Sequence, residues 1–166
     1  MTTDLQQQVA RPYVTSFEPG RRYRRLFRVG NVFMRALLRS RLGEKMQGLS
    51  ILTVTGRTTG KRYAVPVSVL DLDGSPIVLT ASPWRANLRG GAEVEVRAGR
   101  VTRRMRAALV EDPERVADVY ERLLPTVGAK HSKRLGLVLA GDRLPTHDEL
   151  VEAIRGHRYL ITLAER

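Results

Sequence analysis

The sequence predicts an α+β protein built on an antiparallel sheet, and three observations lead to this fold class. Between Leu49 and Val110, short β-branched runs of alternating polarity are separated by turn-forming residues, which is typical of strands. From Asp112 to Gly156 the apolar residues instead recur at helical spacing, and the last residues alternate again as in a strand. Short central strands joined by tight turns favour an antiparallel barrel or sandwich over a parallel βαβ sheet.

The composition indicates one folded domain over residues 1–166. The chain has 166 residues, of which 42% are hydrophobic, so it is long enough to bury a core without disulfides or a structural metal. The lack of cysteine excludes disulfides, thiolate catalysis and cysteine-bound metal, and it fits a cytoplasmic protein. The N-terminus has no secretory signal pattern, and no apolar run is long enough to span a bilayer. We therefore expect a cytoplasmic protein that touches a membrane only at its surface, if it touches one.

The net charge predicts an anionic partner. The formal charge is +12, from 29 lysines and arginines against 17 aspartates and glutamates, and such an excess raises the local concentration of anions. The partner classes are nucleic acid, anionic lipid and an anionic small molecule. Aromatic residues make up only 5% of the chain and no RNA-binding signature is present, which makes nucleic acid the least favoured of the three.

Much of the positive charge lies in an N-terminal arm, residues 1–45. The segment 21–41 is rich in arginine and has no carboxylate. Its apolar residues fall at helical spacing and are Leu26, Val29, Phe33 and Leu37. The segment is therefore predicted to be a basic amphipathic helix. Such a helix either lies on the inner face of an anionic membrane, where each basic residue contributes about 1 kcal/mol, or packs on the domain with its arginines in water. Gly30 and Asn31 interrupt the pattern and favour the second interpretation.

The core strands are expected within residues 49–110. The first three are predicted at Leu49–Thr55, Lys61–Asp71 and Pro76–Ser82. Asp73-Gly74, between the second and third, is a strong signal for a tight hairpin. Two further strands are expected on either side of Gly99.

The helical segment, residues 112–156, is expected to contain three helices. The first begins at the N-cap Asp112, with Pro113 at the first helical position. The second is predicted from about His131 to Ala140, ending at Gly141.

The third helix has the capping-box pattern formed by Thr146 and Glu149, and it is expected to end before Gly156. Residues 158–165 then alternate in polarity and are predicted to form a closing strand. Because one face of this strand is apolar, we expect it to pack against the sheet.

The turn between the first two strands is the main candidate site. Gly56 and Gly60 allow positive φ angles and a close backbone approach to a ligand, while Thr58 and Thr59 offer hydroxyl groups. Successive N–H groups in such a turn can form an anion-binding nest. Three cations flank or follow these residues, namely Arg57, Lys61 and Arg62. The pattern indicates a phosphate-binding turn. An ordinary glycine-rich hairpin with exposed cations has the same pattern. The turn is not a P-loop, because no Gly-Lys-Ser/Thr sequence follows and no helix starts there.

Three motifs in sequence order resemble the deazaflavin-dependent nitroreductase family, within the split-β-barrel oxidoreductases that use coenzyme F420. They are T-G-R-T-T-G-K-R-x-x-V-P from Thr55 to Pro66, the pair Ala81-Ser82, and W-x-x-N-L at Trp84, Asn87 and Leu88. The resemblance extends from near Leu42 to near Ala98. It implies a split antiparallel β-barrel of about six strands, with an N-terminal basic helix and a helical insertion before the last strand.

The resemblance also implies a coenzyme site. The phosphate and the carboxylate-bearing tail of F420 are expected at the hairpin residues Arg57, Thr58, Thr59, Gly60, Lys61 and Arg62. The deazaflavin ring is expected against Val65, Pro66, Ala81 and Ser82. The residues that close the pocket are expected to be Trp84, Asn87 and Leu88.

By the same resemblance the protein is expected to be an F420H2-dependent oxidoreductase. Reduced deazaflavin donates a hydride from its C5 atom to an apolar, quinone-like, nitroaromatic or enone acceptor, and the protein supplies orientation and water exclusion. Two alternatives remain open at this point: a barrel that binds FMN or another anionic cofactor, and a non-enzymatic binder of anionic lipid or nucleic acid.

No catalytic residue and no metal site is predicted. The tyrosines considered as proton donors are expected to be packed rather than catalytic, and they are Tyr13, Tyr23, Tyr120 and Tyr159. The three histidines have no metal-ligand spacing.

The chain departs from the family pattern in three places. The link Ser82-Pro83-Trp84 is short, and Arg89-Gly90-Gly91 replaces the usual Asn-Pro. The helical segment 112–156 is longer than in a typical member, and a lid or a substrate wall is a possible role for it.

Overall fold

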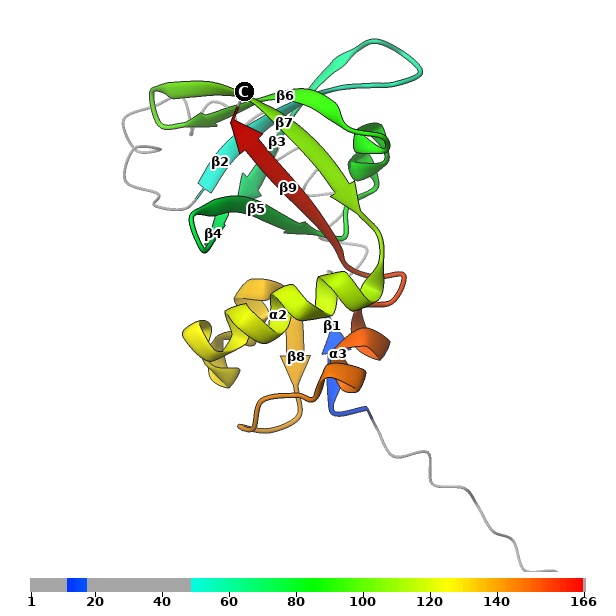
Figure 1. The fold of residues 1–166 in the computed structure, drawn as a ribbon, viewed down its shortest axis with the longest axis vertical. Coiled ribbons are helices and arrows are strands. Elements are labelled where there is room, and N and C mark those ends of the chain that lie inside the picture. Colours follow the sequence, from blue (N-terminus) through cyan, green and yellow to red (C-terminus); the bar gives the residue numbers. More distant parts are fainter. Residues whose placement is uncertain (1–11, 18–48, 166) are drawn as a thin grey trace, which may run out of the picture.

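The computed structural model describes residues 12–17 and 49–165. The predicted basic helix at 21–41, and Tyr23 within it, lie outside the described residues. Figure 1 shows two layers, a curled sheet above and a group of helices with a small two-stranded sheet below.

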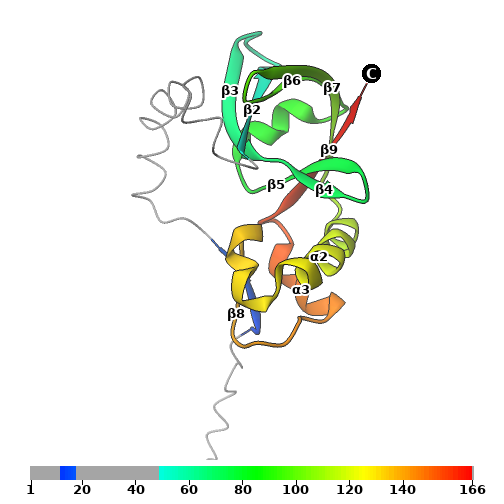
Figure 2. The same cartoon turned by 90° about the vertical axis from the view of Figure 1, so that its left-hand side faces the viewer.

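The larger sheet has seven antiparallel strands in the order β3-β2-β6-β7-β9-β5-β4. The strands are β2 (Leu49–Thr55), β3 (Arg62–Ser68), β4 (Leu70–Leu72), β5 (Ser75–Thr80), β6 (Ala92–Ala98), β7 (Val101–Val110) and β9 (Tyr159–Glu165). The two end strands, β3 and β4, are successive parts of one stretch of chain that is interrupted only at Val69. The sheet therefore curls until its two ends meet, as Figures 1 and 2 show. The α+β class and the six-stranded barrel are confirmed, with β3 and β4 together forming the predicted second strand.

The barrel is filled by alternate residues of its strands, because successive side chains of a strand point to opposite faces. On β2, Leu52 and Val54 are fully buried while Thr53 and Thr55 face outward. The other buried residues of this barrel core are Val67, Val78, Leu88, Val94, Val96, Met105, Ala107, Ile161 and Leu163. Burial of a large apolar side chain contributes roughly 1.5–3 kcal/mol, so this inner face fixes the register of the strands.

The second layer has its own apolar core beneath the barrel. It consists of α2 (Pro113–Val127), the 3-10 helix η3 (Ala129–Leu135), α3 (His147–Ile154), and the paired strands β1 (Val14–Ser16) and β8 (Leu137–Leu139). Ile77 of β5 and Leu160 of β9 reach into this core from the barrel. The two cores are therefore joined through β5 and β9 (Figure 2).

The predicted helix starts and the predicted hairpin are confirmed. The Asp112 side chain accepts a hydrogen bond from the Glu114 N–H at 3.1 Å, and Thr146 with Glu149 forms a complete capping box. Asp73 and Gly74 have φ angles of 51° and 80°, as a two-residue hairpin turn requires.

The predicted helix from His131 to Ala140 is wrong. The chain forms the 3-10 helix η3 up to Leu135, and Gly136 at φ 80° ends it, because a residue in the left-handed region cannot continue the helix. Residues Leu137–Leu139 then pair with Val14–Ser16, a segment that was expected to be part of an N-terminal arm.

The other differences concern the link between β5 and β6. The predicted strand Pro76–Ser82 ends at Thr80, and Ala81-Ser82 leads into a 3-10 helix, η2 (Pro83–Leu88), that was not predicted. Within the described ranges, no helix is both long and apolar enough to cross a membrane.

Candidate functional site

A cleft opens where the barrel is split. The strand order leaves β3 with a strand on one side only, and β4 covers β5 only along Ser75–Ile77. The open edge of β3 therefore lies opposite the unpaired part of β5, and a cleft of about 280 Å³ lies between them. It is lined by residues of β3 and β5, by the start of η2 and by the end of η3.

Four of the residues predicted to bind the coenzyme line this cleft. Pro66 comes from β3, Ala81 and Ser82 follow β5, and Trp84 belongs to η2. Pro66 suits an open edge, since proline has no N–H to donate to a neighbouring strand. Three motifs that are separate in sequence thus meet around one cleft.

Two other predicted residues lie in the barrel core rather than in the cleft wall. Leu88 is fully buried there, and Val65 packs against the same core from β3. Trp84 touches this core as well as the cleft, so Leu88 and Val65 support the wall from behind.

Asn87 connects the hairpin to the cleft. Its Nδ2 atom donates to the carbonyl of Trp84 at 2.9 Å, and its Oδ1 atom accepts from the Arg57 N–H at 3.1 Å. The W-x-x-N spacing is that of one 3-10 turn, in which residues three apart lie over each other. Asn87 therefore holds the β2–β3 hairpin against η2, although it does not line the cleft itself.

The β2–β3 hairpin is a tight, internally bonded turn. Gly56 N–H donates to the Lys61 carbonyl and Gly60 N–H to the Gly56 carbonyl, both at 2.8 Å. The Thr59 hydroxyl accepts from the Lys61 N–H at 3.3 Å and lies 3.2 Å from the Tyr63 hydroxyl. Some of the N–H groups of the predicted anion-binding nest, and one of the two predicted hydroxyl groups, are therefore already bonded within the turn.

The two glycines of the hairpin serve different purposes. Gly60 has φ 64°, as predicted, but Gly56 does not have the predicted positive φ. A Cβ atom on Gly56 would instead lie 2.8 Å from the Thr59 hydroxyl and from the Tyr63 ring. Gly56 is thus required for space and Gly60 for conformation.

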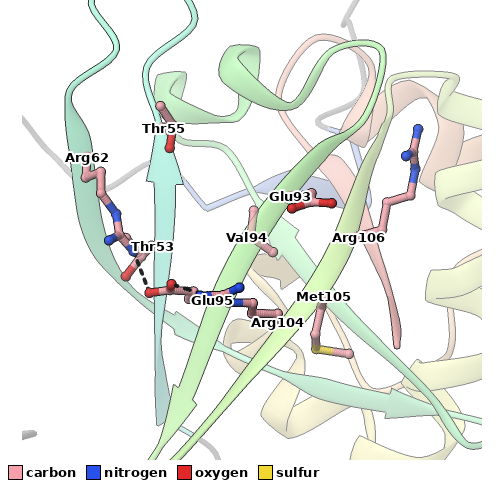
Figure 3. Close-up of a pocket in the computed structure, with 9 residues that line it drawn as sticks. All are labelled: Thr53, Thr55, Arg62, Glu93, Val94, Glu95, Arg104, Met105 and Arg106. Atoms are coloured by element: carbon pink, nitrogen blue, oxygen red, sulfur yellow. Dashed lines mark hydrogen bonds and ion pairs between the residues drawn. The ribbon is translucent and has the colours of Figure 1, made fainter. Parts of the chain in front are cut away.

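The three hairpin cations differ in their surroundings. Arg57 and Lys61 are exposed, and within residues 12–17 and 49–165 neither has a carboxylate partner. Arg62 is directed to the outer face of the sheet, where its guanidinium lies 2.5 Å from the Glu95 carboxylate, as Figure 3 shows. A ligand that binds Arg57 or Lys61 would therefore break no ion pair between described residues.

Figure 3 shows a second hollow, on the outer face of β2, β3, β6 and β7. Its volume is about 320 Å³, and it is lined by arginines of β3 and β7 and by glutamates of β6. Glu95 meets both Arg62 and Arg104, the latter at 4.0 Å. Because its charges largely compensate one another, this hollow is less suited to an anion than the cleft.

The cations of the cleft itself were not predicted from the sequence. Lys133 and Arg134 at the end of η3, and Arg158 before β9, line it. The Arg158 guanidinium lies against Gly136 and donates to the Phe17 carbonyl. Its Nε atom is buried and has no hydrogen-bond partner among the described residues. No pattern in the sequence brings these residues to Pro66 and Trp84, because only the fold of η3 and β8 does so.

Of the candidate proton donors, Tyr120 and Tyr159 are packed, as expected. Tyr120 is fully buried and donates to the Leu135 carbonyl at 2.9 Å, and burial raises the pKa of its hydroxyl. Tyr159 donates to the Gly156 carbonyl, and its ring lies 3.6 Å from the Arg85 guanidinium.

Tyr13 also has a structural role. It donates to the Arg143 carbonyl at 3.0 Å, and the Arg143 guanidinium stacks on its ring.

His147 is surrounded by carboxylates that sequence spacing did not bring together. Its Nε2 atom lies 2.9 Å from Glu114, and its Nδ1 atom lies 3.3 Å from Glu121 and 3.9 Å from Asp118. The hydrogen bond to Glu114, followed by that to Glu121, raises the pKa of the imidazole. This cluster joins α2 to the start of α3 and does not line the cleft.

The open barrel with its cleft places the protein in the split-β-barrel class. Residues 26–134, more than half of the chain, match the model of the F420H(2)-dependent quinone reductase family, so the chain belongs to this family. The resemblance found in the motifs is thereby confirmed, and the protein is an F420-dependent oxidoreductase.

Solved structures with a similar fold include one described as an F420-H2 dependent reductase (FDR-A). It is 19% identical, with 70% of this chain and 94% of that chain covered and a TM-score of 0.41. Another is the FAD and heme binding protein from Mycobacterium smegmatis, 14% identical over 77% of this chain and 67% of that chain, with a TM-score of 0.44. Likenesses this low say nothing about the ligands of this chain. Comparison with curated proteins gives no match.

Proposed function

We propose that the protein reduces a quinone-like acceptor with F420H2 held in the split of the barrel. The observation that carries this proposal is the cleft between β3 and β5, around which Pro66, Ala81, Ser82 and Trp84 meet. When bound, the reduced coenzyme supplies a hydride to the acceptor. The coenzyme tail is assigned to the hairpin, and the ring to the cleft.

The residues present fit such a coenzyme. Its flat ring suits a wall made of Pro66, Trp84 and the apolar part of β5, because planar apolar surfaces pack well against each other. Its anionic tail suits Arg57 and Lys61, the two hairpin cations that have no carboxylate partner within the described ranges.

In this proposal the protein contributes binding and orientation. Arg57 and Lys61 hold the tail, and Asn87 fixes the hairpin relative to Trp84 through its two hydrogen bonds. Trp84 and Pro66 exclude water from the face of the ring. Correct placement of two reactants lowers the barrier by removing their translational and rotational freedom before reaction.

The test is a titration of F420 against the fluorescence of Trp84, the single tryptophan of the chain. We expect saturable binding at micromolar coenzyme. The double variant Arg57→Ala/Lys61→Ala should bind more than tenfold more weakly and keep its thermal stability, because exposed turn residues rarely contribute to stability.

The matched control for this experiment is Arg104→Ala/Arg106→Ala, which removes two exposed cations from the outer face shown in Figure 3. It lowers the net charge by the same amount and should bind the coenzyme as the wild type does. No saturable binding to the wild type would contradict the proposal. Equal losses in the two variants would show that the tail is not held at the hairpin. A purified protein with the absorption spectrum of FMN, which differs from that of F420, would indicate FMN instead.

A further inference from the structure

Among the residues that the structure describes, the end of the cleft formed by η3 carries positive charge and no carboxylate. Of the residues that line the cleft, Lys133, Arg134 and Arg158 are cations and none is a carboxylate. Like charges gathered at one place repel each other and destabilise the folded state unless an anion binds. The Arg158 Nε atom is also buried and has no hydrogen-bond partner within residues 12–17 and 49–165, and such an unsatisfied donor costs free energy that a bound acceptor group would recover.

This positive end is far from the hairpin. β3 runs from Arg62, next to the hairpin, to Ser68, which lines the cleft near η3. Six residue steps along a strand span about 20 Å. Figures 1 and 2 both show the β2–β3 hairpin at the top of the barrel and the gold-coloured residues before β8 at its lower side. The molecule therefore has two separate cationic regions, with the apolar part of the cleft between them.

The position of Arg158 is fixed by the fold. Gly136 has no side chain, and a Cβ atom there would lie 2.5 Å from the Arg158 guanidinium carbon. The guanidinium fills this space and donates to the Phe17 carbonyl, so it is held at the cleft wall. Lys133 and Arg134, in contrast, are exposed and reach the cleft from the last turn of η3. Arg158 is thus held in position by the fold, whereas Lys133 and Arg134 can adjust to a ligand.

We infer that Lys133, Arg134 and Arg158 recognise an acidic group on the acceptor, so that the preferred substrate is a quinone-like molecule carrying a carboxylate or a sulfonate. This inference rests on the proposed function. The coenzyme tail occupies the hairpin end and its ring the middle, which leaves the η3 end for the acceptor. In the reaction a hydride and a proton pass from the reduced coenzyme to the quinone, the proton by way of water, and the products are the hydroquinone and the oxidised coenzyme.

The test compares 1,4-naphthoquinone with its 2-sulfonate, which share a ring system and differ in one negative charge. Because the sulfonate also makes the ring a stronger hydride acceptor, the preference is judged by binding and by comparing each variant with the wild type. Binding to the protein without coenzyme is followed by quenching of Trp84 fluorescence, and kcat/KM is measured with F420H2. We expect the wild type to bind the sulfonate at least tenfold more tightly than the parent quinone. Lys133→Ala/Arg134→Ala should reduce this preference to less than threefold.

Two further variants make the result specific. Arg104→Ala/Arg106→Ala removes the same charge from the outer face and should keep the wild-type preference. Lys133→Gln/Arg134→Gln retains long polar side chains, so it gives the same answer if the alanine variant folds poorly. The inference is overturned if the wild type shows no preference, or if the preference survives loss of Lys133 and Arg134.

The coenzyme titration separates this inference from the function on which it rests. If F420 binds to both the wild type and Lys133→Ala/Arg134→Ala but neither shows a preference for the sulfonate, only the inference fails. If F420 does not bind and the sulfonate preference still depends on Lys133 and Arg134, the proposed function fails and an anion site remains. If the η3 variant instead loses affinity for F420, these cations hold the coenzyme tail and the inference is wrong.

Discussion

Asn87 shows how one side chain can determine the geometry of this site. It donates to the Trp84 carbonyl and accepts from the Arg57 N–H, and so it connects the hairpin to the cleft wall. A hydrogen bond of this kind contributes about 0.5–1.5 kcal/mol, and loss of one partner leaves the other unsatisfied. The motif W-x-x-N-L therefore has a structural explanation that is independent of any contact between Asn87 and a ligand.

Asn87 is expected to contribute both to stability and to coenzyme binding. Asn87→Ala removes both hydrogen bonds and should lower the free energy of unfolding by about 1–2 kcal/mol. It should also weaken F420 binding, because the hairpin backbone at Arg57 is no longer held against η2. Urea denaturation and the Trp84 fluorescence titration measure the two effects.

Asn87→Asp provides the control for that measurement. It keeps the oxygen that accepts from Arg57 but places a carboxylate oxygen against the Trp84 carbonyl, where repulsion replaces a hydrogen bond. If the alanine variant binds F420 as tightly as the wild type, the hairpin needs no support from η2 and the role given to Asn87 is wrong.

At the scale of elements, the sequence predicted those helices and strands whose bounds depend on neighbouring residues in the chain. The bounds of β2, Leu49–Thr55, were predicted from the alternation of its residues, and the caps Asp112 and Thr146 marked the starts of α2 and α3. η3 and β8 were mispredicted because an apolar stretch after His131 fits a helix as well as a strand. Pairing with Val14–Ser16, which is remote in sequence, selected the strand.

The contact between α2 and α3 leads to a prediction about pH. His147 lies among Glu114, Asp118 and Glu121 of α2, and the first and last of these carboxylates raise its pKa. Because the pKa is higher in the folded state, the histidine stabilises the fold fully below its unfolded value of about 6.5. This contribution is lost as the pH rises through the folded pKa.

The comparison of the wild type with His147→Gln measures this contribution. The difference in free energy of unfolding should be largest near pH 6 and should shrink toward pH 9. Glu149, whose pKa is lowered to about 2 by the Arg143 hydrogen bond and then by the Thr146 N–H, stays ionised throughout this range and does not interfere. A difference that is constant with pH would show that the imidazole is neutral in the folded protein.

At the scale of the whole molecule, the sequence predicted the barrel but only part of the site. The motif residues Pro66, Ala81, Ser82 and Trp84 could be identified because each lies in a recognisable local pattern. The cations of η3 and Arg158 could not, since their position depends on how the second layer packs under the barrel. That the hairpin residues contact the coenzyme tail remains a prediction.

The net charge of +12 raises the question whether anions bind through specific cations or through the field of the whole molecule. The two cases differ in their dependence on salt. Charges within about 10 Å of the ligand still act on it at 0.1 M salt, whereas more distant ones are screened. If Arg57 and Lys61 contact the tail, affinity for F420 should fall as salt is raised from 0.02 to 0.3 M, and Arg57→Ala/Lys61→Ala should flatten that dependence.

The control variant Arg104→Ala/Arg106→Ala has the same net charge as the hairpin variant, but its missing cations belong to the outer hollow. It should keep the wild-type salt dependence if contacts with Arg57 and Lys61 dominate, because the two removed cations belong to the outer hollow and not to the hairpin. Equal flattening in both variants would mean that the coenzyme responds to the summed charge of the molecule, and the hairpin would then lose its special role. Since the two variants lose the same net charge at different places, the salt titration distinguishes binding at the hairpin from attraction by the summed charge.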